Sequence, residues 1–192
     1  MEETTLNPPA KLVLIGGSAG SLDALLQIIP RLQQQYPYPI VIVVHRKSPN
    51  DTVLSSLLAT KTDLMVKEIE EKDTLAAGTI YIAPGDYHTL LEEDLTFSLD
   101  YSEKVNFSRP SIDVIFQSMT EVLGNKAIGV LLSGANADGT EGLKYIQKAG
   151  GITIAQQPSS AEVYYMPEHA IASHAVQHIL DPNAIADFLN QL

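Results

Sequence analysis

The sequence contains no cysteine and has few basic residues. Without cysteine the chain can form neither a disulfide framework nor a zinc–thiolate site, and a thiolate nucleophile is excluded. The absence also fits a reducing compartment. Twelve Lys and Arg stand against 23 Asp and Glu, which gives a net charge of −11. Such a surface repels phosphate backbones and anionic lipids, so nucleic-acid and membrane binding are disfavoured.

Long hydrophobic runs are also missing. Apolar runs such as 39–44 fall far short of the roughly 20 residues that span a bilayer. The first ten residues, MEETTLNPPA, are acidic and polar, unlike a signal peptide. We therefore expect a soluble, cytoplasmic protein that does not insert into a membrane.

The length and composition are those of one globular domain. Hydrophobic residues make up 45 % of the 192 residues and charged residues 18 %, which argues against a disordered chain. A chain of this length buries about 70 % of its unfolded surface on folding. There is no repeat, low-complexity stretch or internal linker. We predict a flexible segment over 1–10 and a single domain over 11–192.

Apolar runs alternate with amphipathic segments along the chain. The pattern predicts strands at 11–15, 40–44, 64–69, 79–83, 127–132, 151–155 and 176–180, and helices at 22–32, 51–59, 111–123, 139–149, 167–173 and 183–189. In the first helix, Leu22, Leu25, Leu26 and Ile29 are expected on one buried face. Residues 87–101 alternate around a turn at 92–94, which favours an antiparallel hairpin. This is an α/β pattern: a doubly wound, mostly parallel sheet with helices on both faces and one antiparallel excursion.

Three polar residues follow predicted strands of this sheet. Ser18 follows the first strand, His45 the second, and Asp138 lies in a glycine-flanked loop after 127–132. Ligands of open α/β sheets bind beyond the carboxyl ends of the strands, where the strand order reverses. We therefore expect the three side chains to share one pocket.

Ser18 lies in a glycine-rich turn, 16–20, that matches G-x-S-x-G. Such a turn can project a nucleophilic serine from the sheet edge and aim helix N–H groups at developing negative charge. It can equally cradle an anion, with Ser18 capping the helix, or be purely structural. The dinucleotide motif G-x-G-x-x-G and the lysine of a P-loop are both absent.

A serine nucleophile needs a base, and the base needs a carboxylate that holds its tautomer. His45 and Asp138 suit these roles. The structural alternatives are a partly buried histidine satisfied by a backbone carbonyl, and an aspartate that caps helix 139–149. His88, on the hairpin, is a candidate for the wall of the cleft. The other histidines, at 169, 174 and 178, are expected on a solvated face.

Together these residues resemble the catalytic domain of bacterial chemotaxis protein-glutamate methylesterases, the CheB family. The resemblance runs from about Lys11 to the C-terminus. It comprises six blocks: LIGGSAG at 14–20, VVH at 43–45, IYIAPGDYH at 80–88, RPSIDVIF at 109–116, GVLLSG at 129–134 followed by DG at 138–139, and MP at 166–167.

The resemblance implies a serine esterase, with the catalytic triad at Ser18, His45 and Asp138. The family removes methyl groups from glutamate γ-esters on chemoreceptor helices, and many members also deamidate glutamines. It uses no cofactor or metal. The backbone N–H groups of Ala19 and Ala135 are the expected oxyanion donors. The candidates for the wall of the cleft are Gly17, Arg46, His88, Arg109, Asn136 and Met166.

The chain also departs from the family pattern. Ala19 stands where threonine is common, Ala135 where methionine is common, and Tyr165 where a glycine usually precedes Met-Pro; Gln157-Pro158 replaces two acids. Family members typically carry an N-terminal receiver domain of a phosphorelay, but only about ten residues precede the first predicted strand. Control within the chain is therefore expected to be absent. Constitutive activity, control by a separate regulatory protein and action outside chemotaxis remain open.

Two other function classes remain beside the esterase. One is a non-catalytic module that binds an anion or nucleotide at the glycine turn, and the other is a signalling partner without turnover. The net charge of −11 is expected to slow encounters with acidic receptor helices. Arg46, Lys47 and Arg109 either form a local basic rim near the site or are simply solvated.

Overall fold

The computed structural model describes residues 9–45 and 53–192. Its main sheet consists of β1 (Leu12–Gly17), β2 (Ile40–Val44), β3 (Met65–Glu68), β4 (Thr79–Ile82), β7 (Ala127–Leu131), β8 (Ile152–Gln156) and β9 (His178–Leu180). The strand order is β3-β4-β2-β1-β7-β8-β9, and every neighbouring pair is parallel. The chain moves from β1 to β2 on one side and later to β7 on the other, so the strand order reverses beside β1.

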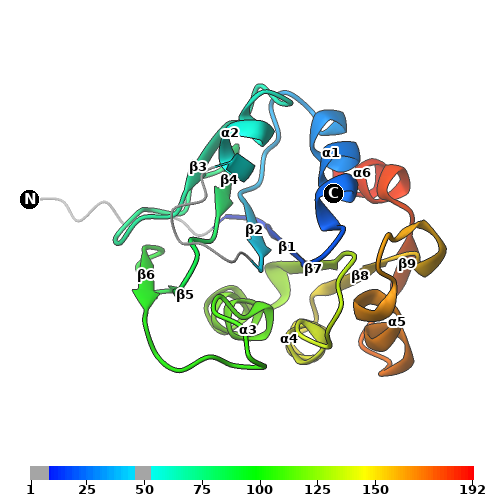
Figure 1. Cartoon of the computed structure of the whole chain (residues 1–192). Helices are drawn as coiled ribbons and strands as arrows, with labels where there is room; N and C mark the ends of the chain where they lie inside the picture. Colours follow the sequence, from blue (N-terminus) through cyan, green and yellow to red (C-terminus); the bar gives the residue numbers. More distant parts are fainter. Residues whose placement is uncertain (1–8, 46–52) are drawn as a thin grey trace, which may run out of the picture.

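Helices cover both faces of this sheet (Figure 1). One face packs against α1 (Ser21–Ile28), α2 (Val53–Ala59) and α6 (Pro182–Asn190), and the other against α3 (Ile112–Leu123), α4 (Thr140–Lys148) and α5 (Tyr165–Ala172). The predicted doubly wound α/β fold is therefore confirmed.

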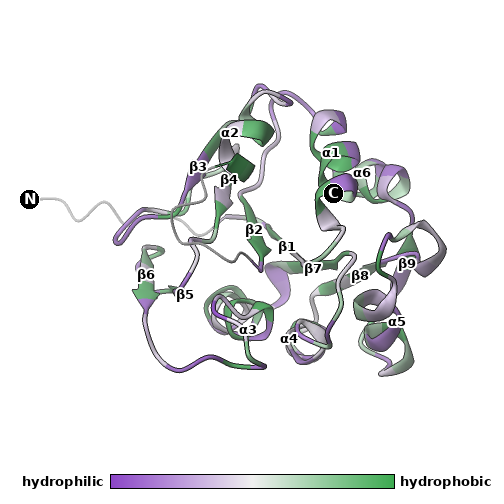
Figure 2. Cartoon of the chain, in the orientation of Figure 1, coloured by the Kyte–Doolittle hydropathy of each residue, from purple (hydrophilic) through white to green (hydrophobic). Residues whose placement is uncertain are grey.

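The central strands are apolar along their whole length because both of their faces are buried. Successive residues of β1 enter opposite cores: Leu12 and Leu14 pack with α3 and α4, whereas Val13 and Ile15 pack with α1 and α6. Figure 2 shows this apolar character along β1, β2 and β7. The apolar strands therefore end at one edge of the sheet, and the polar residues that follow them lie at that edge.

The predicted hairpin is present as a separate two-stranded antiparallel sheet. It consists of β5 (His88–Leu91) and β6 (Phe97–Asp100), with Leu91 opposite Phe97. Both of these side chains are buried in the same core as Phe116 of α3. The hairpin therefore packs against α3, and the segment that follows it connects to the N-terminus of that helix.

The first helix differs from the expectation. The α-helix begins at Ser21 and ends at Ile28, and a 3-10 turn follows over Ile29–Arg31. Pro30 has no N–H to continue the α-helical ladder. Because Ser21, Ala24, Leu25 and Ile28 form the buried stripe, Leu22 lies outside it and is 42 % exposed, so its predicted burial is wrong.

The second helix is described from Val53. The first two residues of the predicted helix 51–59 lie outside the described residues. No helix in the described part of the chain is both long and apolar enough to cross a bilayer.

Candidate active site

The carboxyl ends of β2, β1 and β7 lie side by side and present the predicted residues at one edge. Ser18 follows β1 directly, His45 follows β2 directly, and Asp138 lies in the loop after β7. Ser18 and His45 line the same open cavity of about 420 Å³. The rest of its wall comes from Asp86, Lys104, Phe107, Ser108, Arg109 and Pro110.

The serine turn is fixed by hydrogen bonds to the neighbouring strand-end loop. The Ser18 N–H donates to the Ser133 carbonyl at 2.9 Å, and the Ser133 hydroxyl donates to the Ala19 carbonyl at 2.7 Å. Ser21 closes the turn, because its hydroxyl and its N–H both donate to the Ser18 carbonyl. The N–H groups of Ser18 and Ser21 are therefore used inside the protein and cannot contribute to an anion cradle.

The turn also depends on its glycines. Gly20 has a φ of 76°, which L side chains rarely adopt, and a Cβ there would lie 2.7 Å from the Ser133 hydroxyl oxygen. A Cβ on Gly17 would lie 2.5 Å from that of Ser21. These close approaches are what allow the chain to reverse sharply between β1 and α1.

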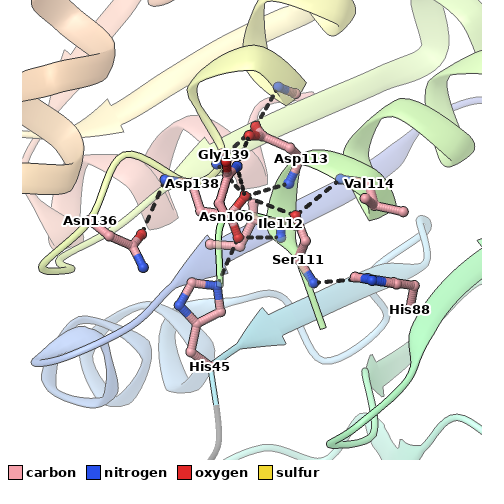
Figure 3. Close-up of polar contacts among 11 residues, drawn as sticks. His45, His88, Asn106, Ser111, Ile112, Asp113, Val114, Asn136, Asp138 and Gly139 are labelled. Atoms are coloured by element: carbon pink, nitrogen blue, oxygen red, sulfur yellow. Dashed lines mark hydrogen bonds and ion pairs between the residues drawn. The ribbon is translucent and has the colours of Figure 1, made fainter. Parts of the chain in front are cut away.

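His45 forms a hydrogen bond with Asp138, the carboxylate that the sequence predicts as its partner. Its Nε2 lies 2.8 Å from Asp138 Oδ2, and the dashed line in Figure 3 marks this contact. With Nε2–H donating to the carboxylate, Nδ1 carries the lone pair of the neutral imidazole. Among the described residues the imidazole forms no hydrogen bond with the Ser18 hydroxyl, although both line the cavity. Catalytic hydrogen bonds are often longer without substrate and tighten when it binds.

Asp138 is fully buried at the N-terminus of α3 (Figure 3). Its carboxylate accepts the N–H groups of Ile112 at 2.7 Å and Asp113 at 3.1 Å, and the Ser111 hydroxyl at 2.9 Å. Burial alone raises the pKa of the group, but the hydrogen bonds from His45 and from these two N–H groups lower it to about 2. Asp138 is therefore ionised across the physiological range.

Asp113 makes the reciprocal contacts at α4. Its Oδ1 accepts the N–H groups of Gly139 at 2.9 Å and Gly142 at 2.7 Å. Burial, together with the negative charge of Asp138, raises the Asp113 pKa to about 6. The N-cap of α4 is Gly139, with no side-chain cap, so the alternative in which Asp138 is the N-cap is wrong, although its Oδ1 accepts the Gly139 N–H at 3.1 Å. Its carboxylate is instead directed mainly at α3, beside His45.

Several predicted wall residues lie behind the cavity. His88 is 1 % exposed; its Nε2 lies 3.0 Å from the Glu103 carbonyl, and its Nδ1 accepts the Ser111 N–H. Met166 is fully buried against Gly134, and Gly17 is buried at the end of β1. The prediction that these three residues line the cleft is therefore wrong, because each of them is packed in the interior.

The other predicted positions are placed as follows. Arg109 lies in the wall of the cavity, whereas Arg46 lies outside the described residues. Asn136 is in the loop before Asp138, and its side-chain oxygen accepts the Asp138 N–H at 3.1 Å. The N–H groups of Ala19 and Ala135 form no hydrogen bond with other described residues.

Three residues beside the site had no assigned role from the sequence. Ser133 holds the serine turn, and Ser111 and Asp113 donate hydrogen bonds to the Asp138 carboxylate. Ser111 was expected only as the start of a helix, which it is, because its hydroxyl accepts the Val114 N–H. No cluster of three His, Asp or Glu side chains within the described ranges could hold a metal ion.

Comparisons with known proteins identify the family of this chain. The sequence profile described as CheB methylesterase matches residues 13–189. A "Putative protein-glutamate methylesterase/protein-glutamine glutaminase" of Leptospira interrogans is 43 % identical over 180 residues, which cover 94 % of this chain and 93 % of the relative.

A longer relative and a solved structure come from Thermotoga maritima. The "Protein-glutamate methylesterase/protein-glutamine glutaminase" of that organism is 34 % identical over 98 % of this chain, which spans 56 % of its length. The crystal structure of the CheB methylesterase catalytic domain of the same organism superposes with a TM-score of 0.91 at 34 % identity, covering 94 % of this chain and 97 % of that one. With its fold, its strand-end site and these relatives in agreement, the chain belongs to the CheB methylesterase family.

Proposed function

We propose that this chain hydrolyses the γ-methyl esters of glutamate side chains on chemoreceptor helices, with residues 11–192 acting as one catalytic domain. Ser18 is the nucleophile, His45 the general base and Asp138 the group that orients it. The observation that carries the proposal is the 2.8 Å contact between His45 Nε2 and Asp138 Oδ2, beside a cavity that Ser18 and His45 share. The family membership supports the same reaction.

The first half of the reaction forms an acyl-enzyme. The Ser18 oxygen attacks the ester carbonyl carbon while His45 Nδ1 takes the hydroxyl proton. The tetrahedral intermediate then expels methoxide, which receives that proton from the imidazolium and leaves as methanol. This step uses the nitrogen of His45 that is not engaged by Asp138.

Water completes the cycle. His45 removes a proton from a water molecule that attacks the acyl-enzyme carbonyl, and the imidazolium returns the proton to the Ser18 oxygen as the ester bond to the enzyme breaks. The product is a free glutamate carboxylate, and the enzyme returns to its starting state. In both halves the ionised Asp138 stabilises the imidazolium and holds its tautomer.

The negative charge on the intermediate needs donors. The N–H of Ala19, which follows the nucleophile, and that of Ala135, in the loop after β7, are the proposed donors because neither is used by another described residue. Since the donors are backbone groups, the alanines that replace larger side chains at these positions do not remove them. One such donor supplies about 3–4 kcal/mol of transition-state stabilisation in serine hydrolases.

Deamidation of glutamine follows the same steps with ammonia as the leaving group. The names of the Leptospira and Thermotoga relatives include this glutaminase activity. Nothing in the triad discriminates between a methoxide and an amine, since both leave by accepting the proton from the imidazolium. We therefore propose that glutamines at the same receptor positions are a second substrate.

The test is product analysis with a chemoreceptor cytoplasmic fragment prepared in two forms. One form carries glutamate γ-methyl esters at its methylation sites, and the other carries glutamines. The wild-type protein should release methanol from the first form and ammonia from the second, and both products should carry glutamate at these sites by mass spectrometry. Absence of methanol release from a fragment that a characterised methylesterase demethylates would refute the proposed function.

A further inference from the structure

The chain places a tight turn with an unusual residue beside the catalytic cavity. Val105 and Ser108 exchange both of their backbone hydrogen bonds, at 3.1 and 2.9 Å, so Asn106 and Phe107 are the two central residues of a hairpin turn. Their φ angles are 50° and 62°. Two positive φ values mark a type I′ turn, whose preferred sequence is Asn-Gly. Asn106 fits this pattern, but Phe107 occupies a position where glycine is favoured.

The Phe107 side chain has no packing that would compensate for this backbone conformation. It is 98 % exposed, the highest value among the exposed large hydrophobic residues of the described chain. It also forms part of the wall of the cavity that holds Ser18 and His45. The positive φ of a bulky residue and the exposure of its ring to water both cost free energy. Unfavourable features of this kind concentrate at functional sites.

The turn is tied to the side chains of Asp113 and Asp138. The Asn106 side-chain amide donates to Asp113 Oδ2 at 2.9 Å and lies 3.4 Å from Asp138 Oδ1, as Figure 3 shows. The position of Phe107 is therefore fixed relative to the triad. A ring held in this way can set where a bound protein segment lies along the cavity.

The surroundings of Phe107 indicate the chemistry of that segment. Lys104 and Arg109 line the same cavity. The Arg109 guanidinium lies 3.7 Å from the ring centroid of Tyr101 and donates to the Tyr101 and Ser102 carbonyls, so its charge is held in place. Tyr101 is 65 % exposed. The cavity wall thus carries two cations against one acid, Asp86, together with the exposed ring of Phe107. On a chain of net charge −11, this local excess of positive charge favours an acidic, partly apolar partner here, and the rest of the surface repels it.

We propose that Phe107 is the anchor by which the enzyme grips its protein substrate: its ring packs between apolar side chains of the acidic helical segment that carries the esterified glutamate. Lys104 and Arg109 face carboxylates of the same segment. The assignment rests on the proposed function, because the occupant of this surface is the substrate itself. It makes Phe107 a specificity-determining residue that discriminates a protein ester from a free one.

The test compares a protein ester with a small ester in the variant Phe107→Gly. Glycine suits the positive φ, so this variant should fold with an unchanged or higher Tm. The two substrates are the methyl-esterified receptor fragment and the γ-methyl ester of Nα-acetylglutamate amide. The ratio of kcat/KM for the fragment to that for the small ester should fall about tenfold, as expected when an apolar contact is lost. Phe107→Leu, which keeps an apolar side chain, should lose less.

Tyr145→Ala is the matched control. Tyr145 is an aromatic residue on α4 that is 44 % exposed and neighbours Thr120 and Glu121 towards the C-terminal end of α3, the end opposite Asp138. Its removal should leave the ratio of the two substrates unchanged.

Three outcomes would overturn the anchor. In the first, Phe107→Gly leaves the ratio unchanged; in the second, it lowers activity on both esters equally, which indicates a structural role. In the third, the wild type sediments as a dimer that Phe107→Gly dissociates, and a second copy of the chain is then the occupant. Failure of the wild type to release methanol from either ester is a different result, because it removes the proposed function and the anchor with it.

Discussion

Asp113 and Asp138 connect the N-termini of two helices. The carboxylate of each residue accepts backbone hydrogen bonds from the start of the other residue's helix. Asp138, just before α4, accepts the N–H groups of Ile112 and Asp113 in α3, and Asp113, in α3, accepts those of Gly139 and Gly142 at α4. The exchange fixes α3 and α4 to each other. It also holds the carboxylate that orients His45 between two helix N-termini, where negative charge is stabilised.

This pair predicts a pH-dependent stability. Burial raises the Asp113 pKa from 3.8 to about 6, so between these values the unfolded chain ionises first and stability falls as the pH rises. Asp138 has the opposite shift, to about 2, and its contribution is constant above pH 5. Asp113→Asn keeps an acceptor for the α4 N–H groups without the charge. Its Tm relative to wild type should increase by about 3 °C or more between pH 5 and pH 8, measured by calorimetry.

A Tm difference between Asp113→Asn and wild type that stays constant from pH 5 to pH 8 would contradict this assignment. Asp187→Asn is a suitable control. Asp187 lies on α6 and is half-exposed, with an ion pair to Arg31, and surface pairs of this kind contribute little to stability. The Tm of Asp187→Asn should change with pH in the same way as the Tm of the wild type.

Asp138→Asn should lower kcat without much change in KM. The side chain is fully buried and bonds to His45 rather than lining the cavity, so substrate binding does not depend on it directly. An amide there cannot stabilise the imidazolium and can hold the wrong tautomer, which in a serine protease triad costs about 10⁴-fold in kcat. Steady-state methanol release at saturating substrate measures the effect. A kcat within tenfold of wild type would show that His45 does not need this carboxylate.

Alanine variants of two glycines with positive φ distinguish the effect of backbone strain from the effect of steric crowding. Gly20 has a φ of 76° and a Cβ there would meet Glu162 and Ser133, whereas Gly124 has a φ of 58° and open space around it. Both alanine variants incur backbone strain, roughly 1–2 kcal/mol at Gly20 in the left-handed region and at least as much at Gly124, whose ψ of −129° lies outside that region. Only Gly20→Ala should also displace the serine turn, so it should show a marked loss of activity, whereas Gly124→Ala should lower the Tm and keep the activity. Equal effects of the two variants on activity would show that the turn tolerates a side chain.

The position of the candidate site could be predicted from the sequence because a simple rule applies to its residues. In a doubly wound sheet the carboxyl ends of neighbouring strands meet, so residues directly after buried apolar runs are brought together. His45 follows such a run directly and Ser18 follows one after two glycines, and the contact between His45 and Asp138 agrees with that expectation. The hairpin was equally visible, because its alternation is strict and its turn is polar.

The supporting residues could not be found in this way. Two of the partners of Asp113 are backbone N–H groups more than 25 positions away along the chain, and a backbone group has no sequence signature. His88 was misplaced because alternation along a short strand does not say which face is buried, and packing turned it inwards. The turn at Asn106-Phe107 was missed because phenylalanine does not mark a type I′ turn.

The most direct test of the whole account is methanol release by Ser18→Ala beside Ser108→Ala. Both serines line the cavity, but only Ser18 is held at the end of β1 in the turn that Ser133 fixes. With the methyl-esterified receptor fragment as substrate, Ser18→Ala should lose at least about 10⁴-fold in kcat while keeping the wild-type Tm, and Ser108→Ala should stay within about tenfold of wild type. Methanol release by Ser18→Ala at the wild-type rate would contradict the assignment of the nucleophile and, with it, the triad.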